Sequence, residues 1–175
     1  MTSTLIDRYQ NYRVRRWLAH EQQTAGMLKN WRPQRRRRIL VVVVTIALLG
    51  LAVAGVIHAL DLSGARVVAL VSALLFLPSW TMLRIASGGQ DYAPDQMLDE
   101  LEIAERNKAR SAGLALTQAL TMPPLAYLIF GSTFAPEADN IAYAGGLMML
   151  ATIMAGGCAP AMILGWTRPD PEPES

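Results

Sequence analysis

A long stretch without a formal charge, residues 39–60, constrains this chain more than any other feature, and it directly follows four consecutive arginines. About 20 apolar residues in a helix match the ~30 Å hydrocarbon core of a bilayer. Basic residues beside a span keep their own segment in the cytoplasm. We therefore predict an integral membrane protein whose N-terminal segment is cytoplasmic.

Three further apolar blocks follow the first. Hydrophobic residues make up 52% of the 175-residue chain, and its mean hydropathy is +0.24. Every Lys and Arg except Arg66 falls in a segment that four spans would place in the cytoplasm, so both termini are predicted there. The large excess of Arg over Lys is typical of GC-rich bacteria. We predict an all-α, four-helix transmembrane bundle in a bacterial inner membrane, with spans at residues 39–60, 67–85, 112–130 and 141–166.

The polar segments complete a three-part organisation. Residues 1–34 are aromatic and basic, and they are predicted to form an amphipathic helix, either at the membrane interface or against a partner protein. Residues 35–166 form the membrane domain. Within the loop between the second and third spans (the 2–3 loop), Pro94 and Asp95 are predicted to begin an amphipathic helix over about 95–109, with Asp95 as its N-cap. This helix either lies against the cytoplasmic membrane face or a partner, or runs into the third span. Residues 167–175 read as a disordered acidic tail.

The sequence lacks the motifs of common catalytic sites. It has no phosphate-binding, dinucleotide-binding, zinc-protease or nucleophile-elbow pattern. Cys158 is the only cysteine, and His20 and His58 fall on opposite sides of the predicted membrane. The net charge of +2 is too small to indicate nucleic-acid binding. We therefore expect no enzyme activity, cofactor, metal site or nucleic-acid partner.

Two small polar groups lie at or within the predicted spans. His58 and Asp61 are three residues apart at the outer end of the first span, where they form either a proton- or quinone-binding pair or a water-exposed interfacial pair. Thr117, Gln118 and Thr121 form a polar face on the third span. Those side chains either line a polar path or hydrogen-bond between helices, and we favour interhelical bonding.

Small residues recur four apart on the first and fourth spans, which lets helix backbones approach closely. The fourth span is therefore expected to be a contact helix, inside this bundle or against another subunit. The residues that we expect to pack in this way are Gly50, Ala54 and Gly55 in the first span, and Ala151, Ala155 and Ala159 in the fourth.

The four arginines Arg35, Arg36, Arg37 and Arg38 are expected to set the topology and to contact anionic lipids of the inner leaflet.

Span interiors without charges and several candidate docking faces favour a non-catalytic accessory subunit of a bacterial membrane complex. The expected partners are other membrane subunits or further copies of the chain. A self-associating effector (a small pore, a holin-like protein or a phage or mobile-element exclusion protein) is the first alternative, and a small transporter is the second.

Overall fold

The computed structural model describes residues 5–24, 27–89 and 93–170, and all secondary structure in these ranges is helical. Four helices are long and apolar enough to cross a membrane. This confirms the predicted all-α class with four candidate spans. The elements are α1 (Leu5–Thr24), η1 (Lys29–Trp31), α2 (Gln34–Ala59), α3 (Ala65–Ala86), η3 (Asp95–Met97), α4 (Glu100–Phe134) and α5 (Asn140–Thr167).

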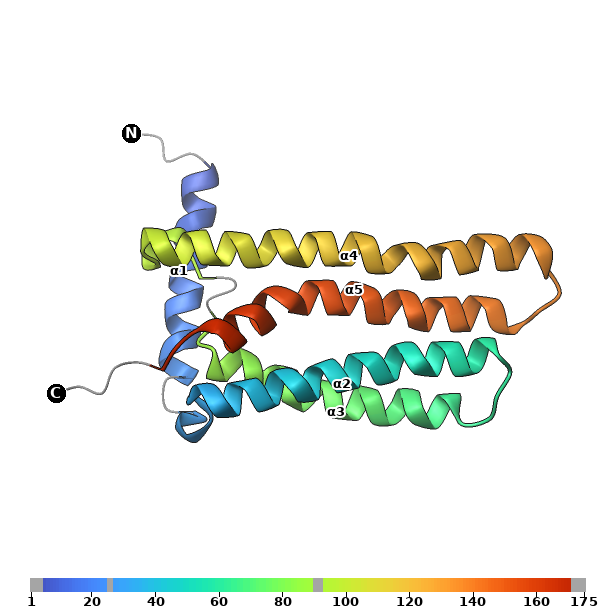
Figure 1. Cartoon of the computed structure of the whole chain (residues 1–175). Coiled ribbons are helices and arrows are strands. Elements are labelled where there is room, and N and C mark those ends of the chain that lie inside the picture. The colour runs from blue at the N-terminus through green and yellow to red at the C-terminus, as the bar shows by residue number, and fades with distance from the viewer. Residues whose placement is uncertain (1–4, 25–26, 90–92, 171–175) are drawn as a thin grey trace.

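The four long helices of the predicted bundle lie in an open row. Figure 1 shows them side by side in the order α4, α5, α2, α3. Helix α5 packs extensively on both α2 and α4, whereas α4 packs extensively only on α5. The physical reason lies in α5, which carries small residues on both of its sides and therefore admits a close neighbour on each. Helix α4 is left at one edge of the row.

The main core lies where α2, α3 and α5 meet. Val44 of α2 and Leu83 of α3 are the largest completely buried side chains among the described residues. Gly165 of α5 brings that helix close to Leu83, since a β-carbon at Gly165 would lie 3.1 Å from a Leu83 methyl group. Helix α3 therefore also contacts α5, although it packs mainly on α2.

In helix α4 the predicted loop helix runs into the third span, which is one of the alternatives that the sequence leaves open. Residues 100–109 of the loop helix and the predicted span at 112–130 belong to one continuous helix of 35 residues. No proline interrupts residues 100–122, so nothing breaks the backbone hydrogen bonding between the two segments. The N-cap is Asp99, whose side chain accepts a hydrogen bond from the Glu102 amide, and not Asp95 as predicted. Asp95 instead begins the short helix η3.

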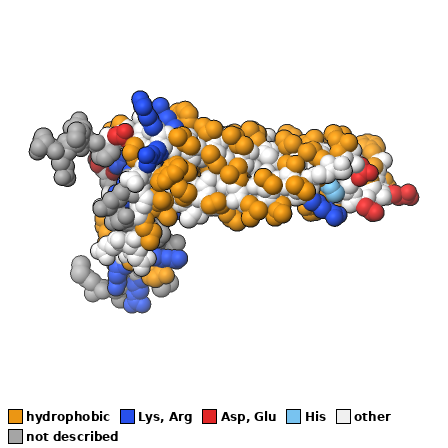
Figure 2. Space-filling model, turned by 90° about the horizontal axis from the view of Figure 1, so that it is seen from below, with side chains coloured by type: hydrophobic (Ala, Val, Ile, Leu, Met, Phe, Trp, Pro, Cys, Tyr) orange, Lys and Arg blue, Asp and Glu red, His pale blue; other side chains and the backbone are white. Residues whose placement is uncertain are grey.

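Charge separates the two ends of the row. Figure 2 shows hydrophobic side chains over most of the face between the ends, with most Lys and Arg at the end that carries α1. Helix α1 lies across this end of the long helices (Figure 1), and its described side chains Tyr12 and Leu18 are exposed. Residues 1–4, 25–26, 90–92 and 171–175, which include most of the predicted tail, lie outside the described ranges.

Candidate functional site

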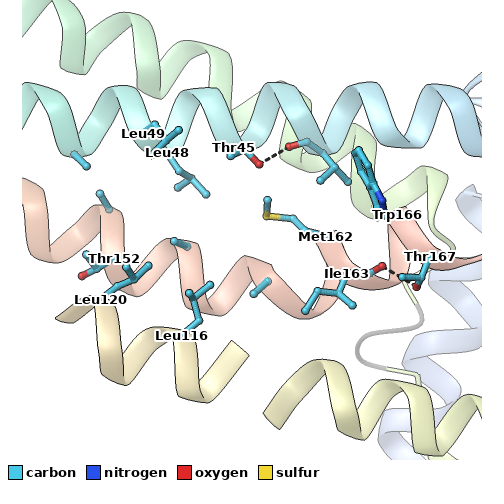
Figure 3. Close-up of a pocket in the computed structure, with 15 residues that line it drawn as sticks. Thr45, Leu48, Leu49, Leu116, Leu120, Thr152, Met162, Ile163, Trp166 and Thr167 are labelled. Carbon is cyan, nitrogen blue, oxygen red and sulfur yellow. Dashed lines mark hydrogen bonds between the residues drawn. The ribbon is translucent and has the colours of Figure 1, made fainter. Parts of the chain in front are cut away.

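An apolar groove runs along α5 between its two neighbours. Helices α2 and α4 both pack on α5 without extensive contact with each other, and the space between them has a volume of about 550 Å³. Figure 3 shows side chains from all three helices around this space, with Met162 directed from α5 toward α2. The residues that line the groove are Val41, Thr45, Leu48, Leu49, Ala52, Leu116, Leu120, Ala151, Thr152, Ala155, Ala159, Met162, Ile163, Trp166 and Thr167.

The threonine hydroxyl groups in the groove form hydrogen bonds within their own helices. The hydroxyl groups of Thr45, Thr152 and Thr167 each donate to a carbonyl of their own helix at 2.9 Å. No described residue of the lining is ionisable at neutral pH. The groove therefore offers dispersion contacts and no free hydroxyl proton, so its physical chemistry suits a hydrocarbon group.

Arg38 and Trp166 stand together at one end of the groove. The Arg38 guanidinium carbon lies 5.1 Å from the centre of the Trp166 ring, within the range of a cation–π contact. Arg38 Nε also donates to the Trp166 carbonyl at 3.3 Å, and Gln34 Nε2 donates to the same oxygen at 3.3 Å. The final carbonyls of α5 lack helical partners, and the start of α2 supplies donors to one of them.

Arg37 is buried within the protein, with only 4% of its surface exposed. Its Nη2 atom donates to the carbonyls of Arg168 and Pro169 at 2.7 and 3.3 Å, and it lies 3.7 Å from an Asp170 carboxylate oxygen. A cation at this point also interacts favourably with the negative end of the α5 dipole. Residues 168–170 are thereby held against α2, although their composition predicts that they belong to a disordered tail.

The other two arginines of the run behave differently. Arg36 lies 5.9 Å from the centre of the Trp31 ring and donates to the Asn30 carbonyl at 2.6 Å. Arg35 is exposed and forms no ion pair within the described ranges. The sequence presents the four arginines as equivalent topology and lipid determinants, whereas the structure gives Arg36, Arg37 and Arg38 contacts within the chain as well.

A second ionic cluster, which the sequence alone does not predict, secures the start of α4. Arg106 is 3% exposed, and its guanidinium binds the Ala93 carbonyl and the Asp95 carboxylate. Arg168, just beyond α5, contacts Glu102 of α4 at 3.2 Å. In the sequence, Arg106 shares one side of the helix with the small residues Ala109 and Gly113. This position is the signal that could have indicated its burial. This cluster ties the 2–3 loop and the end of α5 to α4.

The three-residue polar face of the third span divides in the structure. Thr117 donates to the Gly113 carbonyl of its own helix at 2.7 Å, and Thr121 has a buried hydroxyl without a hydrogen-bond partner among the described residues. Both face α5, whereas Gln118 is exposed on another side of α4. The described residues form no interhelical hydrogen bond through this face, so the favoured interpretation is not seen within the chain.

The predicted small-residue faces are used inside the chain. A β-carbon at Gly50 would overlap the Ser72 hydroxyl of α3, and one at Gly55 would lie 3.0 Å from the Ala144 carbonyl of α5. Ala54 and Ala151 share a small core cluster between α2 and α5. The two remaining predicted packing residues, Ala155 and Ala159, line the groove.

His58 and Asp61 do not pair. The His58 ring packs edge-on against Tyr143 with 4.7 Å between ring centres. Asp61 is exposed past the end of α2, and no ion pair among the described residues joins it to His58. Asn140 binds the carbonyls of His58 and Ala59 at 3.3 Å, which links the ends of α2 and α5. These contacts give His58 a structural role at this end of the row.

Comparison with known proteins adds no relative. Neither the models of known families nor the curated proteins nor the solved structures match this chain. Within the described ranges, no group of three or more His, Cys, Asp or Glu residues is placed to hold a metal ion. The groove, the arginine-rich end and the exposed side of α4 are thus the main candidate surfaces for binding.

Proposed function

We propose that this protein is a non-catalytic accessory subunit of a bacterial inner-membrane complex, and that it docks on a partner helix through the open side of α4. We call this side the outer face of α4. Its members are spaced four, four, three and four residues apart, which places them along one side of a helix. The outer face consists of Leu114, Gln118, Met122, Leu125 and Ile129, all of which are exposed.

The exposed amide group of Gln118, within the apolar part of α4, is the observation that carries this proposal. It lies eight residues, or about 12 Å of helical rise, beyond Arg110, the last charged residue before the apolar part of α4. Its side chain is exposed and has no hydrogen bond within the described ranges. An amide group facing lipid tails without a partner costs several kcal/mol. A polar group on a helix of another subunit would remove that cost.

The rest of the outer face suits a helix partner. Leu114 and Met122 are 62% and 59% exposed and flank Gln118 one turn away on either side. The small-residue faces expected to dock are largely filled by neighbouring helices of the same chain, so α4 is the better docking element. Helix α1, which lies across the arginine-rich end, offers a second surface for a partner or for the membrane interface.

The orientation follows from charge. Arginine-rich ends of spans stay on the cytoplasmic side, so the end with α1 and the start of α2 is proposed to face the cytoplasm. Both termini then lie inside, and the turns around residues 61–64 and 135–139 lie outside. Neither turn contains Lys or Arg, and Arg66 in the first turn of α3 is the single such residue at that end.

Purification from native membranes in mild detergent tests the proposal. The wild-type chain should bring a distinct membrane protein with it at fixed stoichiometry. The substitution Gln118→Leu should weaken the association by about 3- to 30-fold, as expected for loss of one interhelical hydrogen bond of ~0.6–2 kcal/mol. Met122→Leu is the matched control, because it keeps the apolar volume on the same face.

Two results would contradict the subunit proposal. A chain that elutes alone after gentle extraction has no stable partner. A homo-oligomer that Gln118→Leu disrupts would favour the self-associating effector, because Gln118 side chains of two copies can hydrogen-bond to each other. In that case, expression of the chain alone should depolarise the membrane, and Gln118→Leu should abolish the effect.

A further inference from the structure

We propose that the groove between α2 and α4 binds one acyl chain of an anionic glycerophospholipid, and that Arg38 binds the phosphate of its headgroup. This site lies on a different side of α4 from the outer face, because Leu116 and Leu120 line the groove. The proposal is therefore independent of the partner helix proposed above.

The length of the groove matches one leaflet. Its lining on α2 extends from Val41 to Ala52, which is eleven residues and about 17 Å of helical rise. Half of the ~30 Å hydrocarbon core of a bilayer is about 15 Å. The groove also begins at the level of Trp166, a residue type that prefers the boundary between headgroups and tails. A lipid of the leaflet at the arginine-rich end would thus lie along the whole groove.

The shape and lining of the groove suit a flexible hydrocarbon chain. The groove has a volume of about 550 Å³, and its lining on α2, α4 and α5 is almost entirely apolar. A single hydrocarbon chain can follow the groove along α5 and make dispersion contacts with all three helices.

Charge at the mouth of the groove selects for an anion. Three carboxylates at this end contact other arginines: Asp170 is near Arg37, Glu102 contacts Arg168, and Asp95 binds Arg106. No described carboxylate pairs with Arg38 or with Arg35, one turn before it. Guanidinium groups bind phosphate oxygens with charge-assisted hydrogen bonds, often in pairs.

The direction of Arg38 agrees with this role. Arg38 lies seven residues, about two helical turns, before the groove residue Thr45, so the two share one side of α2. Arg36 lies nine residues before Thr45, on the opposite side, and faces Trp31. The two nearby arginines thus form a natural pair for comparison.

Native mass spectrometry of the full-length protein tests the site. The protein is reconstituted into nanodiscs with equal amounts of phosphatidylglycerol and phosphatidylcholine and is then released and weighed with its retained lipids. Wild-type protein should retain one phosphatidylglycerol molecule in preference to phosphatidylcholine. The substitution Arg38→Gln should reduce that preference about fivefold, as expected for one basic residue near an anionic lipid surface. Arg36→Gln should leave the preference unchanged.

A second pair of variants tests the groove itself. Ala155→Phe places a ring in the groove and should abolish the retained lipid. Gly157→Phe is the control on the same helix, because a β-carbon at Gly157 meets no atom within 4 Å, and it should retain the lipid. Unfolding of each variant in detergent is followed in parallel. If Ala155→Phe fails to fold, the arginine pair decides the question.

Three results would overturn the lipid site. Equal retention of both lipids by the wild-type protein would mean that the groove is filled by bulk lipid without headgroup recognition. Equal loss of preference in Arg36→Gln and Arg38→Gln would mean a diffuse basic surface. Loss of a dimer mass in Ala155→Phe, with the lipid count unchanged, would identify a second copy of the chain as the occupant.

Discussion

Single residues at the arginine-rich end connect the start of α2 to the end of α5. Arg37 is buried, binds two carbonyls beyond α5 and lies near Asp170. A buried guanidinium is tolerated here because carbonyl oxygens and a carboxylate replace part of its hydration. This arrangement could not be read from the sequence, since nothing in four identical arginines indicates which one faces the protein.

Substitution of Arg37 should therefore affect stability more than that of its neighbour. Arg37→Gln removes charge-assisted hydrogen bonds to the end of α5, and we expect a loss of about 1.5–3 kcal/mol in the free energy of unfolding. Arg36→Gln, on a different side of the helix, should cost less than about 1 kcal/mol. Unfolding in mixed micelles, followed by circular dichroism, compares the two. Equal losses would show that Arg37 does not fasten α5.

A second residue-scale feature is the close approach of α4 and α5 at Gly156. A β-carbon there would fall inside the Thr117 side chain and 2.9 Å from the Thr117 α-carbon. From the facing helix, a β-carbon at Gly113 would lie 2.9 Å from the Gly156 carbonyl oxygen. Backbone contact of this kind supplies dispersion energy where the hydrophobic effect is absent.

Gly156→Ala should push α4 away from α5. We expect a destabilisation of about 1–3 kcal/mol, which is typical of overpacking at a site that cannot relax easily. The adjacent substitution Gly157→Ala is the control, because its β-carbon points into open space and alanine favours the helix. Thermal unfolding in detergent should rank Gly156→Ala below the wild type and Gly157→Ala at or above it. The reverse order would contradict a close contact between α4 and α5 at Gly156.

Among the elements, the positions of the long helices are easier to predict from the sequence than their neighbours. The apolar runs locate the four long helices well, because a bilayer-length run of hydrocarbon side chains has few other uses. They do not reveal which helices are neighbours, since lipid and protein are equally apolar surroundings for Leu and Val. For the same reason, the sequence pattern groups Gln118 with Thr117 and Thr121, although only Gln118 points away from α5. The groove needs three helices at once, so no pattern along the chain predicts it.

The beginning of α4 depends on Asp99. Its side chain accepts a hydrogen bond from the Glu102 amide at 2.6 Å, so Asp99→Ala should destabilise the first turn by about 1 kcal/mol. Asp139 stands at the equivalent position of α5 but makes no side-chain capping bond. Asp139→Ala should therefore have a smaller effect. Hydrogen exchange of the amides in residues 100–106 should accelerate in Asp99→Ala, and an unchanged rate would count against the cap.

At the scale of the whole molecule, the row combines a packed core with surfaces that no helix of the chain covers. Helices α2, α3 and α5 form a core at one side, while α4 is fastened by α5 and by ionic contacts at its start. The outer face of α4 and the groove are two of the surfaces that this arrangement leaves open. We propose that lipid surrounds all four long helices and that the arginine-rich end lies in the cytoplasm.

Labelling from one side of the membrane tests this claim most directly. Single cysteines are introduced at Ser63, Glu137 and Ser175 in a Cys158→Ala background, and intact spheroplasts are treated with a membrane-impermeant maleimide. We predict that Ser63→Cys and Glu137→Cys react in intact cells and that Ser175→Cys reacts only after lysis. Reaction of Ser175→Cys in intact cells, or protection of both turn positions, would contradict the account.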